Sequence, residues 1–86
     1  MKLSVITPEK MVVEEDDVEA VYGKTTDGMV GILPNHIPLV APLTLAGKVS
    51  FVKNGQKRFL DVDGGLLSMD GCSVTVLSES VEWRPE

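Results

Sequence analysis

Residues 48–62 read KVSFVKNGQKRFLDV, and this stretch decides the fold class. Its centre is the dipeptide Asn54-Gly55, which readily adopts the positive φ angles of a tight hairpin turn. Before the turn, Val49 and Phe51 alternate with polar residues, and apolar and polar residues also alternate after it. Because a period of two is typical of a strand with one buried face, the stretch predicts an antiparallel β-hairpin.

The rest of the chain repeats this pattern of short strands and turns. Three further dipeptides have the same turn chemistry: Asp27-Gly28, Asp63-Gly64 and Asp70-Gly71. Strand-like segments occupy residues 3–6, 11–13, 18–24, 65–69 and 73–77. No window of eleven residues combines helical spacing of apolar residues with freedom from proline and glycine. We expect an all-β sandwich of eight to ten short strands in two packed sheets, with no helix longer than one turn.

Length and composition point to one small domain covering residues 1–86. The net charge is −5, with eight Lys and Arg against thirteen Asp and Glu. This balance argues against nucleic-acid binding and against docking on anionic lipid, because both need clustered basic residues. The sequence shows no signal peptide and no apolar run of the roughly 20 residues that span a bilayer. We therefore expect a soluble, cytoplasmic domain.

Few residues in the chain could carry catalytic chemistry. His36 is the only histidine, and nothing in the sequence places a nucleophile and an orienting carboxylate beside it. Cys72 is the only cysteine, which excludes an intrachain disulfide and predicts a buried thiol that packs as a small hydrophobe. We do not expect an enzyme.

Two acidic stretches are candidate cation sites. Residues 61–64 resemble the start of a calcium loop, but Leu66 and Cys72 occupy the positions that need glycine and glutamate. Residues 14–17 are four consecutive carboxylates. A divalent-cation site, a docking surface for a basic partner and a solvated connection between strands all remain open there, and the solvated connection is favoured. No metal or cofactor site is expected.

The segment at residues 31–40, GILPNHIPLV, predicts a surface that binds a partner. Its two prolines exclude a helix, because Pro38 would lose a helical hydrogen bond and both prolines push the preceding residue toward extended geometry. The segment is therefore stiff, extended and largely apolar. Such a segment loses little entropy when it docks.

The same segment resembles the signature of the epsilon subunit of F-type (rotary) ATP synthases, called delta in mitochondria. The similarity extends over essentially all 86 residues. Residues 3–9 resemble the first strand and turn of that family, and residues 63–67 followed by 74–77 resemble its later glycine-pair strand and closing hairpin. The resemblance implies a ten-stranded β-sandwich in the central stalk, a non-catalytic part of the rotor.

The resemblance also implies two partners and a place in the cell. One flank of the sandwich would bind the gamma subunit, through Asn35, His36, Pro38, Leu39 and Val40. The lower end would rest on the polar loops of the proton-carrying ring, at Asp27 and Met29. Many members carry an acidic residue where this chain has Met29. In this chain the nearby Asp27 would supply the carboxylate in its place. The complex would lie peripherally at the cytoplasmic face of a bacterial inner (plasma) membrane.

Family members commonly continue into a helical hairpin that can inhibit ATP hydrolysis. This sequence stops at residue 86, where the sandwich should end. Whether the hairpin is naturally absent or was removed stays open. Inhibition by a hairpin and nucleotide binding are therefore not carried over to this chain.

The alternative is a small ligand-binding sandwich, such as a carbohydrate module. Such modules generally display aromatic platforms on which sugars stack. The aromatic residues available here are only Tyr22, Phe51, Phe59 and Trp83. We therefore prefer the rotor subunit.

Overall fold

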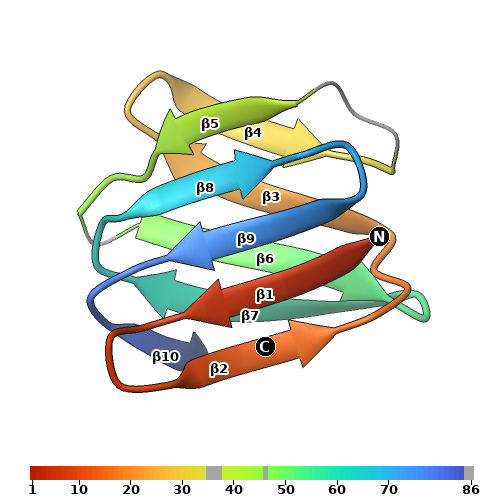
Figure 1. Ribbon diagram of the computed structural model, residues 1–86, viewed down its shortest axis with the longest axis horizontal. Helices are drawn as coiled ribbons and strands as arrows, with labels where there is room; N and C mark the ends of the chain where they lie inside the picture. Colours follow the sequence, from red (N-terminus) through yellow and green to blue (C-terminus); the bar gives the residue numbers. More distant parts are fainter. Residues whose placement is uncertain (35–37, 46, 85–86) are drawn as a thin grey trace.

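The computed structural model describes residues 1–34, 38–45 and 47–84. Ten short strands form two five-stranded sheets that pack face to face, one in front and one behind in Figure 1. This part of the chain contains no helix, and hence none that could span a membrane. The prediction of an all-β sandwich of about ten strands is confirmed.

The first sheet has the strand order β2-β1-β9-β8-β5. Its strands are β1 (Lys2–Ile6), β2 (Met11–Glu15), β5 (Leu39–Pro42), β8 (Leu66–Met69) and β9 (Ser73–Leu77). Neighbouring strands are antiparallel except for β1 and β9, which run parallel at the centre of the sheet.

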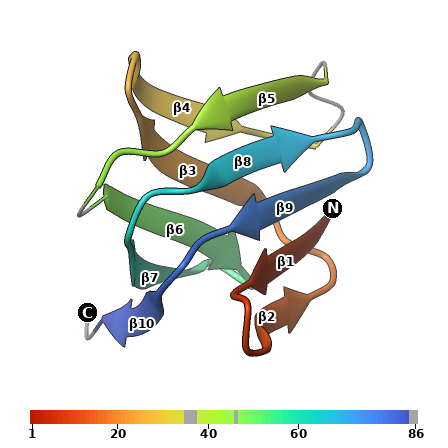
Figure 2. The same ribbon diagram turned by 60° about the vertical axis from the view of Figure 1, so that its left-hand side comes forward.

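The second sheet has the order β10-β7-β6-β3-β4 and is antiparallel throughout. Its strands are β3 (Ala20–Thr25), β4 (Gly28–Ile32), β6 (Gly47–Lys53), β7 (Gln56–Val62) and β10 (Val81–Arg84). The edge strands β4 and β5 lie at one end of the sandwich, and β2 and β10 lie at the other end in both views (Figures 1 and 2).

The core lies between the sheets and is built from alternate residues of nearly every strand. Its fully buried side chains include Leu3, Val5, Val21, Ile32, Val49, Phe51, Leu60, Leu67, Val74 and Val76. Burial of apolar area at about 25 cal/mol per Å² is the main force that holds the two sheets together. At the open end near β2, the Lys53 Nζ and Glu15 Oε1 atoms are 2.9 Å apart and link the second sheet to the first.

The hairpin predicted at Asn54-Gly55 is confirmed as the β6–β7 turn. Both residues have positive φ, 54° and 74°, as a two-residue hairpin turn requires. Asp70-Gly71 likewise joins β8 to β9, but Cys72 in this turn is exposed. The expectation of a buried thiol is therefore wrong, because the carboxylate of Asp70 holds residue 72 in the turn and not in the strand.

The glycine pair after β7 serves a different purpose, because it carries the chain from the second sheet to the first. Gly64 and Gly65 have φ of 69° and 109°. A Cβ on Gly65 would collide with the carbonyl oxygen of Leu77. Only glycine permits this crossing, and it brings the start of β8 directly against the end of β9.

Candidate functional site

The outer face of the first sheet carries a row of apolar side chains that crosses all five strands. The strand register places these residues side by side in the order Pro42, Leu66, Leu77, Ile6 and Met11. Leu66, Leu77 and Met11 are 44%, 46% and 47% exposed. We call these five residues the apolar row. A solvated sheet face normally carries polar residues, so a complete apolar row indicates a surface that another molecule covers.

A second row runs beside the first and is mainly polar. In register order it consists of Val40, Ser68, Thr75, Ser4 and Glu14. Val40 is 71% exposed, while the three hydroxyl residues in the middle are half-buried. Because hydroxyl side chains are short, the centre of the face projects little from the sheet. These groups can still form hydrogen bonds with a partner.

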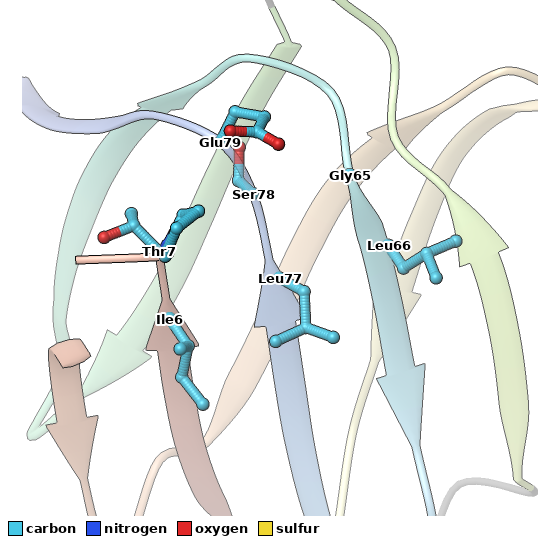
Figure 3. Close-up of a pocket in the computed structure, with 8 residues that line it drawn as sticks. Ile6, Thr7, Gly65, Leu66, Leu77, Ser78 and Glu79 are labelled. Carbon is cyan, nitrogen blue, oxygen red and sulfur yellow. The ribbon is translucent and has the colours of Figure 1, made fainter. Parts of the chain in front are cut away.

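Two hollows lie in this face, one toward each end of its central strands. The first, with a volume of about 400 Å³, is lined by Ile6, Thr7, Pro8, Gly65, Leu66, Leu77, Ser78 and Glu79. Figure 3 shows Ile6, Leu77 and Leu66 projecting from three neighbouring strands along its floor. The second, of about 450 Å³, is lined by Pro38, Leu39, Val40, Ser68, Met69, Asp70, Ser73 and Thr75. Such hollows suit side chains that project from a partner protein.

The residues predicted to bind a partner lie at the second hollow as far as the structure describes them. Pro38 is exposed and Val40 is 71% exposed, whereas Leu39 is half-buried and packs against the core. Asn35 and His36 lie outside the described residues. Among the described residues of this segment, Val40 therefore offers a partner a large and exposed apolar side chain.

The predicted ring-contact residues lie elsewhere, at the turn between β3 and β4. Thr25 is buried, its hydroxyl donates to the Gly28 carbonyl at 2.7 Å, and the Asp27 N–H donates to that hydroxyl at 3.2 Å. These bonds fix the turn and leave Asp27 exposed at its tip. Met29 is 67% exposed. The two sets of predicted residues therefore occupy different surfaces, one on each sheet.

Charged groups lie at the margins of the first-sheet face, at Lys2, Glu14 and Asp70. Lys2 Nζ lies 3.7 Å from Glu14 Oε2 at the side of the face. In the β8–β9 turn, the backbone N–H groups of Cys72 and Ser73 donate to Asp70, and these bonds hold the pKa of the Asp70 carboxyl below its ordinary value. On the far sheet, the hydrogen bond with Glu15 raises the pKa of Lys53.

The four carboxylates at residues 14–17 do not gather around a point. Glu14 faces Lys2 and Glu15 faces Lys53, as their ion pairs show. Among the residues with described positions, no three His, Cys, Asp or Glu side chains come together as metal ligands.

The aromatic residues do not form an open stacking platform where the structure describes them. Phe51 lies in the core and meets Trp83 edge to face, with the ring centroids 6.2 Å apart. The ammonium of Lys57 lies 5.0 Å and 5.6 Å from the ring centroids of Tyr22 and Phe59. Arg58 covers Trp83 in the same way, at 5.0 Å. A sugar would have to displace these cations to stack.

Sequence reasoning missed the apolar row. Its signal was present where two apolar residues follow each other, at Leu66-Leu67 and Val76-Leu77. In each pair one side chain faces the core and the next faces outward. Such a pair predicts a strand and not a binding surface, because the outward face of a sheet is defined only once neighbouring strands are in register.

Comparisons with known proteins agree with this architecture. Residues 1–84 match the family model described as ATP synthase, Delta/Epsilon chain, beta-sandwich domain. The chain is 40% identical over 85 residues to the ATP synthase epsilon chain of Caldicellulosiruptor bescii, covering 99% of this chain and 61% of that protein. It is 43% identical over 82 residues to that of Halalkalibacterium halodurans, covering 95% and 60%. The chain thus spans about 60% of the length of these relatives.

Solved structures show the same fold at lower identity. A chain of the Euglena gracilis mitochondrial ATP synthase, solved with OSCP, F1 and the c-ring, superposes with a TM-score of 0.86. The identity is 18%, over 94% of this chain and 51% of that one. A chain in the central stalk and c-ring structure from Tetrahymena thermophila gives 0.77 at 16% identity, over 95% and 65%. Since the family model covers nearly every residue, the chain belongs to the family of β-sandwich domains of ATP synthase delta/epsilon chains.

Proposed function

We propose that this domain is a non-catalytic part of the ATP synthase rotor that couples the proton-carrying ring to the gamma subunit. The observation that carries the proposal is the apolar row, which family membership alone does not supply for this chain. A face with apolar side chains across five strands and two hollows suits a protein partner better than solvent or a small ligand.

The first-sheet face is the proposed gamma surface. The apolar row provides area whose burial is worth about 25 cal/mol per Å², less the cost of association. Val40 and Pro38 extend the surface over the second hollow. The stiffness of the backbone there favours docking, since little conformational entropy remains to be lost. Asn35 and His36 are proposed to extend the same contact.

The β3–β4 turn is the proposed ring surface. Asp27 offers a carboxylate in the turn, whose backbone is held by hydrogen bonds of the Thr25 hydroxyl, and Met29 offers an adaptable apolar side chain near the start of β4. The gamma and ring surfaces lie on different sheets of one rigid sandwich. Torque applied at one surface would therefore reach the other through hydrogen-bonded sheets and a packed core.

In this role the domain acts at the cytoplasmic face of a bacterial plasma membrane, peripheral to the bilayer. It needs no cofactor of its own. Its contribution to ATP synthesis is mechanical, because it holds ring and shaft together while the chemistry takes place in the catalytic head.

Calorimetric titration of this chain with the gamma subunit of the same enzyme tests the gamma surface. Leu77→Asp places a charge at the centre of the apolar row, where burial would leave it unpaired, and we expect affinity to fall at least about tenfold, or ~1.4 kcal/mol. Met29→Asp, on the other sheet, is the matched control and should bind like the wild type. Unchanged affinity of a folded Leu77→Asp protein would remove the row from the interface.

A further inference from the structure

The edges of the two sheets differ in how well they are protected. Four strands form these edges: β2 and β5 in the first sheet, and β10 and β4 in the second. An edge strand presents unpaired N–H and C=O groups that can pair with another chain. Proteins usually block such an edge with charges, prolines, bulges or short strands.

Three of the four edges carry such protection. β2 contains Glu14 and Glu15, and its pairing with β1 is interrupted by a register shift. β5 is four residues long and ends in Pro42, which has no N–H. β10 is also four residues long and carries Glu82 and Arg84.

The remaining edge, β4, has none of these devices. Its sequence, Gly28–Ile32, contains neither a charged residue nor a proline, and no strand within the described ranges pairs with its outer side. Two large apolar side chains flank this edge in the open, Met29 at 67% and Leu33 at 57% exposure. An edge of this kind is suited to strand addition.

The pairing of β4 with β3 determines which backbone groups remain available. Thr25 and Gly28 form the closing pair of the two-residue turn, and such a pair is hydrogen-bonded. Bonded and non-bonded residues alternate along an antiparallel pair. Gly28, Val30 and Ile32 therefore bond to β3, while the backbone groups of Met29 and Gly31 point to the open side.

This pattern is complementary to itself. If two copies meet antiparallel about a two-fold axis at Gly31, Met29 of each copy lies beside Leu33 of the other. The two exposed apolar side chains then cover each other. Gly31 places no side chain at the two-fold axis. The Tyr22 ring lies over Gly31, and a Cβ on Gly31 would be only 3.1 Å from that ring.

We propose that a second copy of this chain pairs with β4 through its open edge and joins the two second sheets into one continuous sheet. The inference goes beyond the proposed function and does not depend on it.

Only five residues of each copy take part, so the association is weak and appears at about 0.1 mM and above. The net charge of −5 on each copy opposes it, so added salt strengthens it. Met29 belongs both to this edge and to the proposed ring surface. A domain that is paired with a second copy therefore cannot contact the ring through Met29 at the same time.

Sedimentation equilibrium of the chain up to about 1 mM, at low and at high salt, tests the proposal. We expect a monomer–dimer equilibrium that salt favours and that Met29→Lys weakens at least tenfold. Met11→Lys is the matched control, because it makes the same change at an exposed methionine on the opposite edge. It should not weaken the association, because it also reduces the net negative charge that opposes pairing.

Amide exchange distinguishes strand pairing from contact between side chains. The Gly31 N–H should exchange more slowly as the concentration rises in the wild type, and not in Met29→Lys. A chain that remains monomeric throughout overturns the proposal. So does a dimer that survives Met29→Lys, or one that only Met11→Lys disrupts, since the copies would then meet through the face of the first sheet.

Discussion

At the scale of single residues, the fold depends on a few positions where the backbone takes an unusual path. Asp70 holds the β8–β9 turn by accepting hydrogen bonds from the N–H groups of Cys72 and Ser73, at 2.9 Å and 2.8 Å. Gly65 allows β8 and β9 to meet at the crossing between the sheets. Both residues also line the candidate interface, one at each hollow, so local backbone chemistry shapes the surface as well as the fold.

The Asp70 carboxylate should make stability depend on pH. Its pKa is lower in the folded chain than the ordinary value of 3.8, so the ionised form is the one that stabilises the fold. That contribution is complete above the unfolded pKa and is lost as the pH falls through the folded pKa. We expect Asp70→Asn to lower the Tm at pH 7, and the difference from wild type to shrink below about pH 4. A difference that stays constant down to pH 2 would contradict this.

Two glycines with almost the same φ separate backbone strain from steric collision. Gly65 has φ 109° and no room for a Cβ, whereas Gly71 has φ 105° with nothing within 4 Å of an added Cβ. Gly71→Ala should cost about 1 kcal/mol from strain alone, while Gly65→Ala should cost more than about 3 kcal/mol or prevent folding. Urea denaturation measures both. Equal losses of stability for the two variants would show that the backbone at Leu77 can shift to make room for a Cβ on Gly65.

At the scale of strands, consecutive residues differ in burial, and this difference separates side chains that stabilise the fold from side chains that are available to a partner. Val76 and Leu77 are consecutive in β9, but Val76 is fully buried in the core and Leu77 is exposed in the apolar row. Val76→Ala should lower the free energy of unfolding by about 2 kcal/mol. Leu77→Ala should change it by no more than about 0.5 kcal/mol. A comparable loss for Leu77→Ala in denaturant unfolding would mean that the row serves the fold.

Most strands were predictable because local chemistry specifies them. Asn54-Gly55 and the alternation around it predict the β6–β7 hairpin, which forms as expected. The segment at residues 31–40 is predicted to be extended, yet the place of Leu39–Pro42 as the edge strand β5 follows from pairing with β8, far along the chain. Cys72 was misplaced because a side-chain hydrogen bond, which periodicity does not report, sets the end of its turn.

The candidate interface was predictable only in part, for a related reason. The residue types at Pro38 and Val40 are enough to indicate a stiff segment that binds a partner. The apolar row combines residues from five strands, and its existence depends on registers that include a parallel pair between β1 and β9. A resemblance to a family can point to the flank involved. Only the folded sheet shows that Ile6, Leu66 and Leu77 stand side by side.

At the scale of the whole molecule, the two proposed contact surfaces lie on different sheets of one sandwich. The sheets are joined by a continuous core and by the Lys53–Glu15 ion pair. A sandwich of short strands offers no second packing that a ligand could favour, so the described domain should transmit force and not switch. Adding ATP to the purified chain should therefore give no heat in calorimetry, and saturable binding in the micromolar range would contradict this.

We propose above all that the apolar row is the surface that binds gamma. Methyl NMR of the chain labelled at leucine and methionine, recorded as the gamma subunit is added, tests it most directly. We predict that the methyl signals of Leu66 and Leu77 shift or broaden on binding, while Met29 on the other sheet and the buried Leu60 keep their positions. Binding that moves Met29 and leaves Leu66 and Leu77 unchanged would contradict the account.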